Sequence, residues 1–167
     1  METFLTTVGN RSTEGAVGAD NERMLEIKIV SFGYKSGPPP HANMLFDVRF
    51  LDNPYWVEEL RPLNGLDKTV QKYVIEQPLA QHFLHSLIAM ASEVLPEMAK
   101  RNAKTVTIAF GCTGGQHRSA SIAEYTAQKL KELFPDYMVR ISHRELDGRS
   151  SVSHDDARSQ FDPNRKS

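Results

Sequence analysis

The chain has 167 residues, a length that suits one domain with a complete core and argues against two. Its 20 lysines and arginines balance 21 aspartates and glutamates, and its one cysteine excludes an intramolecular disulfide, so contact with nucleic acid would depend on a local basic patch. We find neither an apolar run near the roughly 20 residues of a membrane span nor a secretory signal, and we expect a cytoplasmic protein without a membrane partner.

Composition separates a central segment from two tails. Residues 1–24 and 146–167 are rich in small and polar residues with little periodicity, and we predict that both tails are disordered. The segment 25–145 carries the periodic apolar patterns, and we predict that it is the folded domain.

Strand and helix patterns alternate along this segment. The expected elements, in chain order, are a strand at 25–30, a glycine- and proline-rich loop at 31–41, a strand at 43–50, a helix at 67–77, a long helix from 79 that ends or kinks near Pro96, a strand at 104–110, a helix at 117–133 and a strand at 137–141. This alternation predicts an α/β fold with a small, mostly parallel sheet flanked by helices. Ligands in such sheets gather at the carboxyl ends of the strands.

The stretch from Thr105 to Tyr125 is the most informative part of the chain. A β-branched run stops at Gly111, a glycine-rich loop follows, and a helical pattern begins near His117. Loop amides and the unpaired amides of a first helical turn then converge on one point, where the helix dipole favours negative charge. An ordinary turn is the alternative, but the crowding of polar and cationic groups favours an anion site. Its predicted residues are Cys112, Thr113, Gly114, Gly115, Gln116, His117, Arg118 and Ser119.

The same loop also fits a second chemistry. The spacing of Cys112, Arg118 and Ser119 matches the Cys-x5-Arg-Ser/Thr spacing of cysteine-dependent phosphatases, with Asp47 as the candidate general acid. Gly111 stands where that family usually has histidine. Free cysteine is often a small buried residue, so we keep the phosphatase as the alternative to a binding site.

Further polar side chains follow the predicted strands and turns. Each alone reads as a surface charge or a turn residue, yet together they lie where the loops of one sheet edge meet. We predict that they form the rim of a pocket or contact RNA: Lys35, Arg49, Asn53, Tyr55, Arg61, His143 and Arg144. No spacing of histidine and acidic residues suggests a metal site, and we expect no cofactor.

Four ordered motifs resemble the C-terminal domain of the RapZ/YvcJ family. They are Ser31-Phe-Gly-Tyr-Lys-Ser-Gly37, Phe46-Asp-Val-Arg-Phe-Leu-Asp-Asn-Pro-Tyr-Trp56, Leu60-Arg-Pro-Leu-Asn-Gly-Leu66 and Ala109-Phe-Gly-Cys-Thr-Gly-Gly-Gln-His-Arg-Ser119. The resemblance covers about residues 27–145 and implies a domain similar to a phosphofructokinase subdomain, which binds RNA and senses an amino-sugar phosphate. Full-length members also carry a P-loop domain with a Walker A motif. This chain has no such motif, so it looks like a free-standing C-terminal domain, and we do not expect nucleotide hydrolysis.

The resemblance also assigns roles to residues. It implies that Thr113, Gly114, His117 and Arg118 hold the phosphate, and that Lys35, Arg49, Arg61, His143 and Arg144 line the sugar pocket or contact RNA phosphates. Two residues depart from the family pattern: Gln116 replaces a lysine, and Tyr55 replaces a histidine. A near-neutral tail also replaces the basic one, which weakens RNA binding more than small-anion binding. We therefore favour a non-catalytic sensor of a phosphorylated small molecule, with RNA as a second ligand and oligomerisation through Tyr55 and Trp56 as an open question.

Overall fold

The computed structural model describes residues 24–147, so most of both predicted tails lies outside the described residues. The strands are β1 (Glu26–Gly33), β2 (Met44–Asp47), β3 (Thr105–Cys112) and β4 (Met138–His143). The helices are α1 (Lys68–Ile75), α2 (Pro78–Lys100) and α3 (Arg118–Leu133), with short 3-10 turns η1 (Tyr34–Ser36) and η2 (Pro54–Trp56). None of the described helices combines the length and the apolar character needed to cross a membrane.

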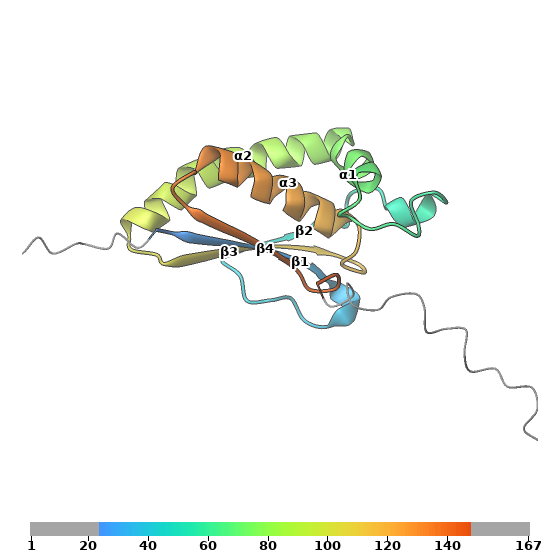
Figure 1. Ribbon diagram of the computed structural model, residues 1–167, viewed down its shortest axis with the longest axis horizontal. Helices are drawn as coiled ribbons and strands as arrows, with labels where there is room; N and C mark the ends of the chain where they lie inside the picture. The colour runs from blue at the N-terminus through green and yellow to red at the C-terminus, as the bar shows by residue number, and fades with distance from the viewer. Residues whose placement is uncertain (1–23, 148–167) are drawn as a thin grey trace, which may run out of the picture.

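The four strands form one sheet in the order β2-β3-β1-β4, and every neighbouring pair is parallel. Ile29 of β1 is in register with Ile108 of β3 and with Ile141 of β4. The three helices lie together on one face of the sheet (Figure 1). The predicted α/β fold is therefore confirmed, as a two-layer arrangement.

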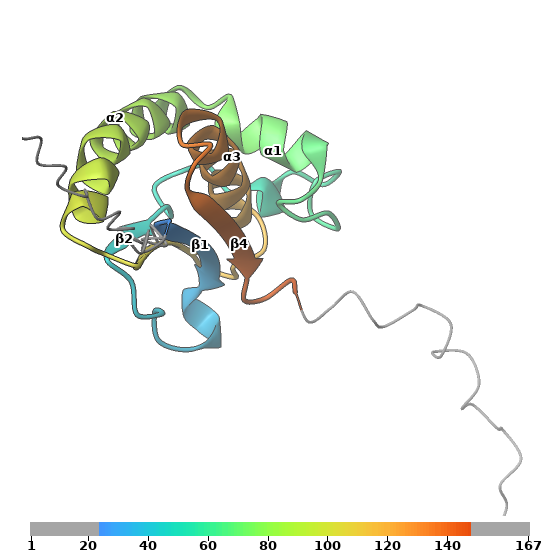
Figure 2. The same cartoon turned by 60° about the vertical axis from the view of Figure 1, so that its left-hand side comes forward.

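The direction of each connection explains why the helices share one face. Connections β2–β3 and β3–β4 cross the sheet in one direction, whereas β1–β2 crosses it in the other. Because parallel crossovers are almost always right-handed, β1–β2 must then pass over the opposite face. Its segment, 34–43, contains three prolines and runs on the side away from the helices (Figures 1 and 2).

The two faces of the sheet differ in polarity. On the helix side, Ile27, Ile29, Val106, Ile108 and Phe110 are buried and form the core with apolar residues of the helices. The opposite face carries polar side chains near the start of the strands, where Glu26 lies 3.3 Å from Lys28 Nζ and 3.0 Å from Arg140 Nε. Polar side chains and the proline loop thus compensate for the helix layer that a parallel sheet usually has on its second face.

Some element boundaries differ from the prediction. β1 and β3 continue to Gly33 and Cys112, so the segment between β3 and α3 is only 113–117. α2 runs through Pro96 to Lys100. Proline has no N–H and so cannot donate to the carbonyl four residues earlier. That carbonyl belongs to Ser92, an exposed residue, so water can take the place of the missing donor. Leu146, which we placed in the C-terminal tail, is buried.

Candidate functional site

The segment 113–117, here called the anion loop, links β3 to α3 and packs against two other loops through glycines. A Cβ on Gly33 would lie 2.6 Å from the carbonyl carbon of Gly114, and one on Gly65 would lie 2.5 Å from the carbonyl oxygen of His117. Gly115 has φ of 71°, a conformation that favours glycine. These glycines let three backbone segments meet at the carboxyl end of the sheet.

Two hydrogen bonds orient the peptides of the anion loop. The amide of Lys35 donates to the carbonyl of Thr113 at 3.1 Å, and the amide of Gly65 donates to the carbonyl of Gln116 at 2.7 Å. In a trans peptide the N–H points opposite to the C=O. The amides of Gly114 and His117 share peptides with the bonded carbonyls of Thr113 and Gln116, so they point away from Lys35 and Gly65.

The backbone amides from Gly114 to Ala120 donate no hydrogen bond within residues 24–147. The first turn of α3 has neither an acidic residue nor a side chain that caps it. The first amides of a helix need outside acceptors, and this end of the helix favours negative charge. The loop and helix start therefore present consecutive amide donors that have no acceptor among the described residues.

Arg118 begins α3, is only 6% exposed, and is held by the neighbouring chain. Its Nη1 donates to the carbonyls of Arg49 at 3.1 Å and Leu51 at 3.0 Å, and its Nη2 donates to Thr113 Oγ1 at 3.3 Å. Its Nε is buried and has no partner among the described residues. A buried donor without an acceptor costs about 1–3 kcal/mol, so a ligand acceptor beside Nε would recover a penalty that the free protein bears.

His117 precedes Arg118, and its tautomer follows from its partner. Its Nε2 lies 2.8 Å from the carbonyl oxygen of Leu63, which only accepts, so Nε2 carries the proton. Burial lowers the pKa of His117, and the charge of Arg118 lowers it further. The ring is therefore neutral at neutral pH and leaves Nδ1 as an acceptor.

A cleft of about 610 Å³ opens over the anion loop. Its wall includes η2, where Tyr55 and Trp56 are 47% and 76% exposed and lie edge to face at 5.4 Å. The cleft is lined by Lys35, Asn53, Tyr55, Trp56, Cys112, Thr113, Gly114, Gln116, His117 and Arg118. All of these except Trp56 are among the site residues predicted from the sequence, which places Trp56 at an interface instead.

Cys112 and Asp47, the candidate nucleophile and general acid, both contact neighbouring side chains. Cys112 lines the cleft but is only 2% exposed and packs with core residues, with its Sγ 3.1 Å from Ser119 Oγ. Asp47 accepts hydrogen bonds from Arg49, and the Arg49 side chain is the main reason that the pKa of Asp47 lies below its usual value. A general acid must be protonated at working pH, whereas Asp47 is held ionised.

Arg49 and Arg61 lie outside the lining of the cleft. The guanidinium of Arg49 stacks over Tyr34 at 4.4 Å from the ring centre. Arg61 donates from Nε to the carbonyl of Tyr55 at 3.1 Å and lies 5.3 Å from the centre of the Tyr55 ring. Both arginines thus support residues near the cleft.

His143 and Arg144 are also absent from the cleft lining. His143 is buried, with Nδ1 2.8 Å from Ser31 Oγ and Nε2 2.9 Å from Glu124 Oε1. Arg144 donates to the carbonyls of Gly33 and Pro38 and so ties β4 to the β1–β2 connection. Both residues lie at the carboxyl end of β4, but their side chains contact neighbouring protein groups rather than the cleft.

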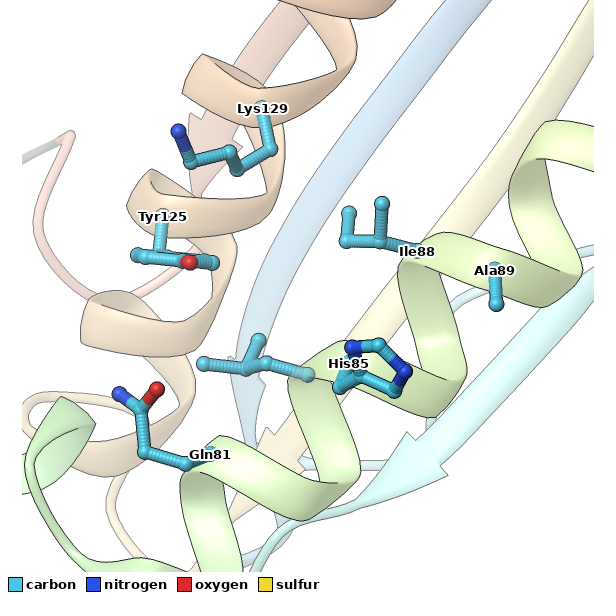
Figure 3. A pocket seen from close by; sticks show the side chains of 7 residues that line it. Gln81, His85, Ile88, Ala89, Tyr125 and Lys129 are labelled. Atoms are coloured by element: carbon cyan, nitrogen blue, oxygen red, sulfur yellow. The ribbon is translucent and has the colours of Figure 1, made fainter.

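A second hollow of about 320 Å³ lies between α2 and α3 (Figure 3). It is lined by Gln81, Leu84, His85, Ile88, Ala89, Tyr125 and Lys129. Lys129 is paired with Glu132 at 2.7 Å, and no residue predicted for the anion site lines this hollow. Within residues 24–147, no group of three histidine, cysteine or acidic residues is placed to hold a metal ion.

Residues 25–147 match the family model described as the RapZ C-terminal domain. The chain is 42% identical over 130 residues to a nucleotide-binding protein of Bacillus cytotoxicus, covering 78% of this chain and 43% of that protein. It is 47% identical over 125 residues to a nucleotide-binding protein of Nitratidesulfovibrio vulgaris, covering 75% and 42%. The chain spans less than half the length of these relatives. The match over most of its length shows that this chain belongs to the RapZ C-terminal domain family.

Proposed function

We propose that this domain is a non-catalytic binding or sensor module that holds the phosphate group of a small molecule at the anion loop. The observation that carries this proposal is that the amides from Gly114 to Ala120 and the buried Nε of Arg118 have no acceptor within residues 24–147. A phosphate offers several acceptor oxygens to such donors, and the start of a helix favours its charge.

The rest of the cleft suits a sugar carrying that phosphate. A volume of about 610 Å³ exceeds the needs of a phosphate alone. Asn53 and Gln116 can exchange hydrogen bonds with hydroxyls, and the exposed ring of Tyr55 offers an apolar face. An amino-sugar phosphate is the ligand that the family resemblance favours. The relatives named nucleotide-binding proteins make a nucleotide the competing ligand.

RNA is a second candidate ligand because of the exposed rings at the cleft mouth. Trp56 is the most exposed large apolar side chain in the described part of the chain, and it lies beside Tyr55. Lys35 lines the same cleft and makes no side-chain ion pair within residues 24–147. Aromatic platforms beside cations bind single-stranded nucleic acid by stacking and by phosphate contact.

Binding is tested by calorimetry and thermal unfolding with inorganic phosphate, glucosamine 6-phosphate, AMP and a short single-stranded RNA. A ligand at 100 times its dissociation constant should stabilise the fold by about 2.7 kcal/mol. Arg118→Lys keeps the charge but lacks the planar fork, so it should bind phosphate at least about tenfold more weakly. Arg61→Lys, outside the cleft, is the control. Equal phosphate affinity in Arg118→Lys and Arg61→Lys would refute the proposed site.

A further inference from the structure

Glu145 is a largely buried carboxylate that lies behind the anion loop, outside the lining of the cleft. It follows β4, and its side chain is 10% exposed. Oε1 accepts a hydrogen bond from Arg144 Nε at 2.8 Å, while Oε2 is buried with no partner among the described residues. A Cβ built on Gly115 would collide with this carboxylate, so Glu145 lies directly against the loop.

The loop separates Glu145 from the cleft. Gly114 and Gln116 line the cleft, whereas Gly115 between them is buried and faces Glu145. An anion at the loop amides would therefore lie on one side of the loop backbone, and the carboxylate of Glu145 would lie on the other. Little water separates them, since both Oε2 and Gly115 are buried.

Within residues 24–147, Glu145 forms an ion pair with Arg144, whose guanidinium also binds other groups. Arg144 pairs with Oε1, but its other donors go to the carbonyls of Gly33 and Pro38. Its guanidinium also lies 5.3 Å from the centre of the Phe32 ring. The unpartnered Oε2 thus leaves negative charge next to a loop built to receive an anion.

We propose that Glu145 is a selectivity determinant that weakens anion binding in proportion to the charge of the ligand. The inference rests on the proposed function, because it needs an anion at the loop. Coulomb repulsion scales with the product of the charges and is strong where water is excluded. The repulsion therefore costs a dianion twice as much binding free energy as it costs a monoanion. The factor by which it weakens dianion binding is then the square of the factor for a monoanion. The negative charge of Glu145 would keep the affinity for the anion moderate, so that the fraction of occupied protein changes with the ligand concentration.

The test uses the full chain and two probes of similar size. At about pH 8, methyl phosphate is a dianion and methanesulfonate a monoanion. Glu145→Gln keeps the shape and the acceptor for Arg144 but removes the charge, and Glu145→Ala removes the whole group. The control is Glu132→Gln, which changes an exposed carboxylate in the last turns of α3.

Glu145→Gln should bind methanesulfonate about threefold tighter and methyl phosphate about tenfold tighter than the wild type. Glu145→Ala should give the same order of gains, and Glu132→Gln should bind as the wild type does. The inference is overturned if both Glu145 variants bind the probes no tighter, or tighten both by the same factor. If the wild type and the variants all fail to bind methyl phosphate, the proposed function fails, and this inference fails with it.

Discussion

Replacing Gly33 with alanine should disrupt the anion loop from behind. The new Cβ would lie 2.6 Å from the carbonyl carbon of Gly114 and 2.7 Å from the amide nitrogen of Gly115. These are backbone atoms, so no side-chain rotation relieves the contact, and the two segments must separate by about 0.8 Å to reach the 3.4 Å of ordinary contact. Overpacking of this kind costs about 1–3 kcal/mol. A binding site tolerates only about 0.5 Å of displacement, so phosphate affinity should fall at least about tenfold.

Gly114→Ala is the matched control for stability, because a Cβ at Gly114 meets no described atom within 4 Å. Both variants remove a glycine from the same site, and their effects on the unfolded chain should cancel in the comparison. Urea unfolding measures the stability of each variant, and calorimetry measures phosphate affinity. Equal free energies of unfolding for Gly33→Ala and Gly114→Ala, together with a phosphate affinity of Gly33→Ala equal to that of the wild type, would show that this close approach does not hold the loop in place.

Three further predictions concern groups beside the loop. Because burial lowers the pKa of His117 in the folded state, His117 is protonated in the unfolded chain before it is protonated in the folded protein as pH falls below about 6.5. Below that pH the wild type should therefore lose stability relative to His117→Gln. A difference in urea unfolding that does not change with pH would contradict this. Cys112→Ser should keep phosphate affinity within about twofold by calorimetry, since the thiol packs in the core; phosphatase turnover in the wild type that this variant abolishes would contradict a binding role. Asp47→Asn should lower the free energy of unfolding by less than about 1 kcal/mol near pH 7, because the ion pair with Arg49 is exposed. This loss should disappear in acid, once the pH falls through the lowered pKa of Asp47 and the wild-type carboxylate is protonated. A larger loss, or one that does not change with pH in urea unfolding, would count against the pairing.

The fold class could be predicted because the apolar residues recur with the spacing that a buried strand or a helix with one buried face needs. The alternation in β1 and the β-branched run of β3 indicate strands, and the start of α3 was placed within one residue of Arg118. Restriction of the helices to one face was not predicted. That feature depends on the strand order, and no local pattern in the sequence reports which strands become neighbours.

The loop residues of the site could be predicted, but the partners of the distant cations could not. The loop and the N-terminus of α3 are local, so spacing alone brings Thr113 and Arg118 together. The positions of His143 and Arg144 depend on which side of β4 each side chain faces and on the path of the β1–β2 connection. The contact between Glu145 and Gly115 depends on the same tertiary detail.

The most direct measurement of the central claim is an amide NMR titration of the labelled chain with inorganic phosphate. The account predicts saturable shifts concentrated in the backbone amides from Gly114 to Ala120 and in the Nε–H of Arg118, which lack acceptors within the described part of the chain. Residues around the hollow between α2 and α3, such as His85 and Tyr125, should remain unshifted. Saturable shifts at that hollow with none in the anion loop would contradict the account.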